Sequence, residues 1–128
     1  MSNWRWVRHD VVYAVHDMKL AQHGGLSGIR DQNAVLAALG RPEQLDVYGE
    51  PAPDAAALAA AYAFGIVRTH GFSDGNKRTA WVAARLLLVD NGYTLRCNAV
   101  DAILTVEQVA AGAINEDQLA DWFRQQLV

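Results

Sequence analysis

The sequence predicts an all-α fold of about six helices, organised as one domain over residues 1–128. Hydrophobic residues make up 52% of the chain and recur at helical spacing in several segments. Glycine, proline and asparagine divide these segments into lengths typical of helices. A single domain of this size buries about two-thirds of its unfolded surface without disulfides. The content of charged residues, 20%, argues against disorder.

The N-terminal part is predicted to form two helices joined by a loop. The first covers residues 9–22, because apolar side chains recur there at helical spacing and two glycines follow. Residues 26–31 are expected to form the loop, and Asp31 is the expected N-cap of a second helix that ends near Leu39. Arg30, beside it, is assigned to the same capping and loop chemistry.

Residues 40–53 are predicted to be the longest irregular stretch, because all three prolines of the chain lie there. Asp54 then opens a helix that runs to about Thr69. This helix is apolar nearly all round, which predicts a central, buried position. The next helix is predicted from Asn76 to Asn91, where an Asn-Gly pair ends it.

Two more helices are expected in the C-terminal part. Asn98 caps one that runs to about Ala111. Asn115 with Gln118 resembles a capping box for the last helix, whose apolar residues line one face.

Composition limits the classes of function. The net charge of −3 and the pI of about 5.7 argue against a general nucleic-acid binder. The single cysteine, Cys97, cannot form an internal disulfide, which favours a reducing compartment and a cytoplasmic location. The N-terminus shows no secretory signal, and the longest apolar run, residues 55–67, is too short to span a bilayer. No membrane association is expected.

The segment HGFSDGNKRTA, residues 70–80, places charged and polar residues at a bend between two apolar helices. The backbone N–H groups at the start of a helix near Asn76 lack intrahelical acceptors, and the helix dipole adds positive charge there. Such a helix end binds phosphate oxygens. Gly75 allows a ligand to approach the backbone closely, while Lys77 and Arg78 add full positive charges.

Two further residues of the bend complete a transfer site. Asp74 offers a carboxylate that can hold Mg²⁺ against phosphate oxygens. His70 is of the residue type that exchanges protons near neutral pH, as a general base requires. Together these residue types predict phosphoryl or nucleotidyl transfer. A Walker A loop is excluded, because positions 76 and 78 carry Asn and Arg and a helix precedes the bend in place of a strand.

The stretch HGFSDGNKR resembles the Fic/Doc signature, H-x-F-x-[DE]-[GA]-N-[GK]-R. Lysine at its eighth position is similar to the Doc (death-on-curing) branch. Three other segments resemble the same branch, so that nearly the whole chain is covered. They are HDVVYAVHDMKLAQHGGLSGIRD (9–31), NKRTAWVAARLLLVDNG (76–92) and VAAGAINEDQLADWF (109–123).

The resemblance implies an all-helical Fic fold and ATP-dependent transfer, with Mg²⁺, onto a protein hydroxyl. For Doc toxins the implied reaction is phosphorylation of a threonine on elongation factor Tu, which arrests translation. By matched position, His70 would deprotonate the target hydroxyl and Asp74 would ligate Mg²⁺. Asn76 would hold the loop and a phosphate oxygen. Lys77 and Arg78 would neutralise charge on the transferred group.

Two other functions stay open. Lys77 stands where adenylyl-transferring Fic enzymes usually carry glycine, which favours transfer of the γ-phosphoryl group. Gly75 stands where the best-known Doc pattern has alanine, which keeps adenylyl transfer open. A non-catalytic module that only senses nucleotide is the third hypothesis. The chain has no match to the inhibitory [ST]-x-x-x-E-[GN] segment of some Fic proteins, so the resemblance implies a separate Phd-type antitoxin as partner.

Three segments of the chain are candidates for extended structure. Residues 93–97 and 4–7 are candidates for short strands. The 40–53 segment, with Tyr48, is a candidate flap that holds a target peptide by strand addition.

Arg68 and three histidines are charged or titratable residues outside the motif. Arg68 either reaches the nucleotide or solvates a helix face. The three histidines spaced by seven residues lie too far apart along a helix to share one ion, and we expect them at the surface or the edge of the core: His9, His16 and His23.

Overall fold

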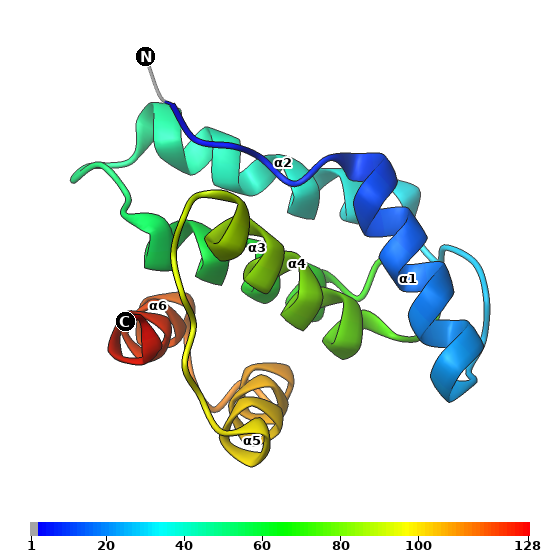
Figure 1. Cartoon of the computed structure of the whole chain (residues 1–128). Coiled ribbons are helices and arrows are strands. Elements are labelled where there is room, and N and C mark those ends of the chain that lie inside the picture. The colour runs from blue at the N-terminus through cyan, green and yellow to red at the C-terminus, as the bar shows by residue number, and fades with distance from the viewer. Residues whose placement is uncertain (1–2) are drawn as a thin grey trace.

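The computed structural model describes residues 3–128 and consists of α-helices joined by loops, without a sheet in that range (Figure 1). The predicted all-α fold of six helices is confirmed. The helices are α1 (His9–His23), α2 (Gln32–Tyr48), α3 (Ala55–Thr69), α4 (Asn76–Asp90), α5 (Ala99–Ala110) and α6 (Glu116–Gln126).

Helix α3 lies at the centre of the fold, in contact with α2, α4 and α6 (Figure 1). Its many alanines allow neighbouring helices to approach closely. Gly65 lies against Ala38 of α2, and a Cβ added to Gly65 would be in van der Waals contact with Ala38. Tyr62 is fully buried there, and its hydroxyl accepts the backbone N–H of Val7 at 3.1 Å. Burial raises the pKa of Tyr62 to about 12.

The prediction of an irregular stretch over residues 40–53 is wrong for most of its length. Helix α2 continues to Tyr48 with Pro42 inside it. A proline in a helix removes one backbone hydrogen bond, but Pro42 is buried and belongs to the same apolar face as Leu39 and Leu45. Tertiary packing therefore outweighs the local preference. Tyr48 ends a helix and is 81% exposed, so the candidate flap reduces to residues 49–53.

The predictions of two short strands are also wrong, because the backbone groups of these segments bond other partners. The N–H and carbonyl of Arg5 bond the side chain of Asn91, and no strand forms over residues 4–7. Residues 93–97 pair with the C-terminal end of the chain only through a single bridge, Leu95 with Leu127. Within the described chain, β pairing is limited to this bridge and to a second one, Ile29 with Phe72.

The predicted helix caps at Asp31, Asp54, Asn98 and Asn115 are confirmed. Asn115 and Gln118 form the expected capping box, with both hydrogen bonds at 2.8 Å. In the described range, every helix falls short of the combined length and apolar character that crossing a membrane requires.

We expect Asp54→Ala to lower the free energy of unfolding by about 1 kcal/mol. Asp54 accepts the N–H of Ala57 at 2.9 Å as the cap of the central helix, and its carboxylate bonds the Arg124 guanidinium at 2.7 Å. Urea denaturation measures the change. Asp121→Ala removes the other carboxylate on Arg124 without a cap and is the matched control, with a loss below about 0.5 kcal/mol.

The contribution of Asp54 to the free energy of unfolding depends on pH. The hydrogen bond from Arg124, with the Ala57 N–H, holds the pKa of Asp54 below its ordinary value. A carboxyl with a lowered folded-state pKa stabilises the fold above its unfolded pKa of about 3.9 and loses this effect as pH falls through the folded value. The difference between wild type and Asp54→Ala is therefore present at neutral pH and should shrink below about pH 4. An unchanged difference at pH 3 would contradict this account.

Candidate active site

The α3–α4 loop, residues 70–75, carries the motif and is fixed by one buried side chain. Asn76, 5% exposed, accepts the N–H of Phe72 at 3.1 Å and donates to the carbonyl of the same residue at 3.0 Å. Phe72 is 1% exposed and belongs to the hydrophobic core. The backbone of the loop is therefore bonded to the first residue of α4 while its aromatic ring is buried.

The α1–α2 loop, residues 24–31, lies beside the motif and bonds its backbone. The carbonyl of Gly71 accepts the N–H groups of Arg30 and Asp31 at 2.8 and 2.9 Å. The Arg30 guanidinium also donates to the carbonyls of Thr69 and His70 at the end of α3. Arg30 thus supplies the positive charge that the C-terminal end of a helix favours. Capping and loop chemistry was the role predicted for this residue pair.

Gly71→Ala is expected to destabilise the protein by about 1–3 kcal/mol. A Cβ at Gly71 would lie 2.5 Å from Val35 Cγ2 and 2.9 Å from the Val35 backbone nitrogen, and that backbone cannot move without shifting α2. Gly40→Ala is the matched control, because nothing lies within 4 Å of its Cβ and helix propensity predicts a gain of about 0.5–1 kcal/mol. Equal denaturation midpoints for the two variants would show that the loop is not held this tightly.

His16 packs against the loop and, of the three histidines predicted at the surface or the edge of the core, is the buried one. It is 2% exposed, and its ring stacks on Phe72 with centroids 3.9 Å apart. Its Nε2 lies 2.8 Å from the carbonyl oxygen of Asp74, so the Nε2–H tautomer donates there. The other two histidines of the helix, His9 and His23, are exposed.

His70 is the C-cap of α3 and has left-handed backbone dihedrals, φ 49° and ψ 47°. Among residues 3–128 it is the one non-glycine residue with positive φ. This conformation disfavours an L-residue by about 1–2 kcal/mol, and such strain is concentrated at functional sites. The side chain is exposed and lines a cleft, where it can meet an acceptor hydroxyl.

Asp74 is exposed, and both its carboxylate oxygens accept backbone hydrogen bonds. Oδ1 accepts the N–H of Gly75 at 2.9 Å and Oδ2 accepts that of Leu26 at 3.2 Å. These bonds hold the pKa of Asp74 below its ordinary value, and the charges of Arg78 and His70 act in the same direction. The carboxyl is therefore ionised at neutral pH.

Helix α4 begins directly after Gly75, its N-cap, which has φ 77° and provides no side chain to cap the helix. The first-turn residues Asn76, Lys77 and Arg78 line the cleft, and the N–H groups of a first helical turn have no intrahelical acceptors, as an anion site requires. A Cβ at Gly75 would meet Leu20 and His16 only at 3.4 Å and beyond, so the left-handed backbone, not lack of space, favours glycine here.

A cleft of about 920 Å³ brings the predicted site residues together between the end of α3, the start of α4 and α5. Its lining combines the polar residues of the motif with apolar and aromatic side chains. The predicted residues that line it are His70, Asp74, Gly75, Asn76, Lys77 and Arg78. Those that sequence reasoning missed include Trp81, Arg85, Leu95, Cys97 and Glu107. No motif marked this second set, because the fold alone brings it to the motif.

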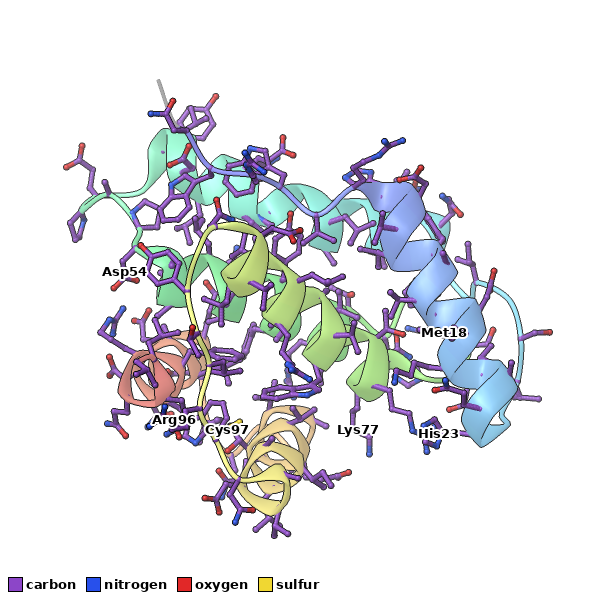
Figure 2. The ribbon with its side chains drawn as sticks, viewed as in Figure 1. Met18, His23, Asp54, Lys77, Arg96 and Cys97 are labelled. Atoms are coloured by element: carbon purple, nitrogen blue, oxygen red, sulfur yellow. The ribbon has the colours of Figure 1, made fainter. Side chains whose placement is uncertain are left out.

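Two cations near the motif contact α5. Lys77 pairs with Glu107, its Nζ lying 2.8 Å from Oε1. Figure 2 shows Lys77 at the N-terminal end of α4, on the side of the bundle where α5 lies. Arg68 donates to the carbonyls of Val109 and Ala110 at 3.4 Å. Arg68 therefore bonds the last turn of α5, which is neither of the two roles predicted for it.

The donor set fits a magnesium ion shared with a nucleotide. Proteins hold Mg²⁺ at phosphate-transfer sites through one or two carboxylates together with the substrate phosphates. Asp74 offers one ionised, exposed carboxylate beside the uncapped end of α4, and each oxygen retains capacity for a further ligand.

Comparison with known proteins supports the resemblance. A model of the Fic/DOC family matches residues 6–88. The chain is 34% identical over 120 residues, 94% of its length and 94% of the relative, to a protein named protein kinase doc, from Escherichia phage P1. It is 45% identical over 73 residues, 56% of its length and 55% of the relative, to toxin Doc of Mycolicibacterium smegmatis. The chain belongs to the Fic/Doc family.

Proposed function

We propose that this protein is the toxin of a type II toxin–antitoxin pair and a protein kinase. It transfers the γ-phosphoryl group of ATP to a threonine of elongation factor Tu in the cytoplasm and so arrests translation. Family membership supports the transferase class, and the relative named protein kinase doc supports the choice of group. The partner is a Phd-type antitoxin.

One observation carries the choice of phosphoryl transfer: the side chain of Lys77 at the start of α4. Lys77 lines the cleft within the first turn of the helix, beside the N–H groups that would bind the phosphates. A glycine at this position would leave the backbone path open for phosphates lying deeper along the helix end. A lysine there narrows that path and adds a cation where the terminal phosphate would lie.

In the proposed reaction, each side chain of the motif has one role. His70 accepts the proton of the threonine hydroxyl as its oxygen forms a bond to the γ-phosphorus. The bond from that phosphorus to the β–γ bridging oxygen breaks, and ADP leaves. The N–H groups of the α4 first turn, with Lys77 and Arg78, bind and neutralise phosphate oxygens. Asp74 would hold Mg²⁺, which supplies positive charge against those oxygens.

The decisive measurement is the mass of elongation factor Tu after incubation with the protein, ATP and Mg²⁺. A gain of one phosphoryl group on a threonine, absent with His70→Ala, is the expected result. An unmodified acceptor, together with no affinity of the protein for any nucleoside triphosphate in calorimetry, would refute the proposal.

Adenylyl transfer is the second candidate, favoured by Gly75, the glycine found in Fic enzymes at a position with left-handed backbone. It predicts label from the α-phosphate of ATP on a protein acceptor. If only γ-label is transferred, the second candidate fails.

A nucleotide-sensing module without catalysis is the third candidate. It predicts that His70→Ala still arrests growth. Loss of arrest in a His70→Ala variant that folds and binds its antitoxin would rule it out.

A further inference from the structure

We propose that Glu107 of α5 is a positioning residue for Lys77 in the transfer reaction. This inference rests on the proposed function and extends it to a residue outside the motif. The carboxylate accepts a 2.8 Å hydrogen bond from the Lys77 ammonium, and both side chains line the cleft. Glu107 acts through Lys77 and does not need to touch the substrates.

Glu107 is a second carboxylate in a cleft built for an anion. The other charged side chains that line the cleft are Asp74, which the metal would neutralise, and the cations Lys77, Arg78 and Arg85. A carboxylate repels phosphates unless a cation is paired with it. Its partner, Lys77, is the residue that distinguishes this motif from its adenylyl-transferring counterparts. The cleft therefore includes a charge whose use is to hold that lysine.

The turn of α5 that carries Glu107 is itself anchored. Arg68, from the last turn of α3, donates to the carbonyls of Val109 and Ala110 at 3.4 Å. Val106 and Val109, on either side of Glu107, are buried in the core. The carboxylate thus extends from a fixed backbone and gives Lys77, which has four rotatable side-chain bonds, one preferred position.

The pair formed by Lys77 and Glu107 is too exposed for a contribution to folding stability to explain it. The side chains of Lys77 and Glu107 are 48% and 53% exposed, and such pairs contribute little to folding. Positioning has a different consequence. A cation that is already in place where charge develops lowers the barrier to transfer, whereas a mobile one must be ordered during the reaction.

Glu107→Gln keeps the size of the side chain and removes its charge. We expect kcat for phosphoryl transfer to fall about tenfold, because Lys77 loses its preferred position. We expect KM for ATP to fall by about threefold, because a negative charge leaves the anion cleft. The denaturation midpoint should stay unchanged, which separates this role from a structural one. Asp101→Asn removes the same charge from the same helix without contacting Lys77 and should alter neither constant.

Exchanging the two charges tests whether the position of the cation matters. Lys77→Glu alone should reduce the rate of transfer to the limit of detection. Adding Glu107→Lys should raise the rate at least tenfold above that of Lys77→Glu, because a cation again lies on the cleft wall between α4 and α5. A double variant no more active than Lys77→Glu would contradict the proposal.

Acetylation of the Lys77 amine, followed by mass spectrometry, tests the pair without nucleotide. The hydrogen bond to Glu107 holds the Lys77 amine away from the reagent, so Lys77 should react about threefold faster in Glu107→Gln than in wild type. Equal rates, or an unchanged kcat in Glu107→Gln while wild type transfers phosphate, would overturn the role of Glu107 alone. Failure of wild type to bind nucleotide would overturn the proposed function, and the inference with it, even if the acetylation rates differ.

Discussion

Replacing His70 by alanine is expected to reduce the rate of transfer by about 10²–10⁴-fold, the range for loss of a general base. His70 is exposed, and its ring makes no hydrogen bond within residues 3–128, so the fold should survive the change. Rates with elongation factor Tu, ATP and Mg²⁺ measure the loss. Nucleotide affinity should remain within about twofold, because the anion site lies on α4.

His70→Gly is the matched variant for this prediction. Glycine adopts the left-handed conformation of position 70 without strain, so this variant should be more stable than His70→Ala by about 1 kcal/mol. Both variants should be equally inactive. A His70→Gly protein that is more stable yet retains the wild-type rate would show that the ring at position 70 does not act as the base.

Replacing Asn76 by alanine is expected to lower the free energy of unfolding by about 2–4 kcal/mol and to remove transfer activity. The change leaves the N–H and the carbonyl of Phe72 without partners in a buried site, since both bonds to Asn76 are lost. The loop that carries His70 and Asp74 would then lose its fixed conformation. Thermal and urea denaturation measure the first effect, and the mass of the acceptor measures the second.

Asn91→Ala is the control for that experiment. Asn91 also bonds backbone groups with its side-chain amide, those of Arg5 and Leu87, but far along α4 from the cleft. It should reduce stability without changing kcat at saturating ATP. If Asn76→Ala behaved in the same way, the amide would be only a structural support and the loop would not depend on it.

Local sequence signals predicted the helices well and the irregular segments poorly. Helix caps depend on a few neighbouring residues, so Asp54 and Asn115 could be recognised in the sequence. Pro42 led to the wrong prediction of an irregular segment, because proline disfavours a helix only through the local backbone. Burial of an apolar face decides that α2 continues through Pro42. The residues on that face continued at helical spacing past the proline and could have revealed the helix.

The candidate site divides in the same way. The motif predicted the cleft residues of the α3–α4 loop and of the first turn of α4, because those residues are neighbours in the sequence. His16 and Glu107 had no such signal. His16 looked like one of three evenly spaced histidines, and only its packing against Phe72 separates it from the two that are exposed.

By itself, the sequence determined the helical class, the helix caps and the concentration of charged and polar residue types at residues 70–78. These are properties of short segments, set by backbone geometry and by residue type. The tertiary structure alone decided the cleft beside α5, the strained backbone of His70 and the pairing of Lys77 with Glu107. Such features depend on contacts between different elements of the fold, as with Lys77 and Glu107, which are separated by 30 positions. Only folding brings those residues together.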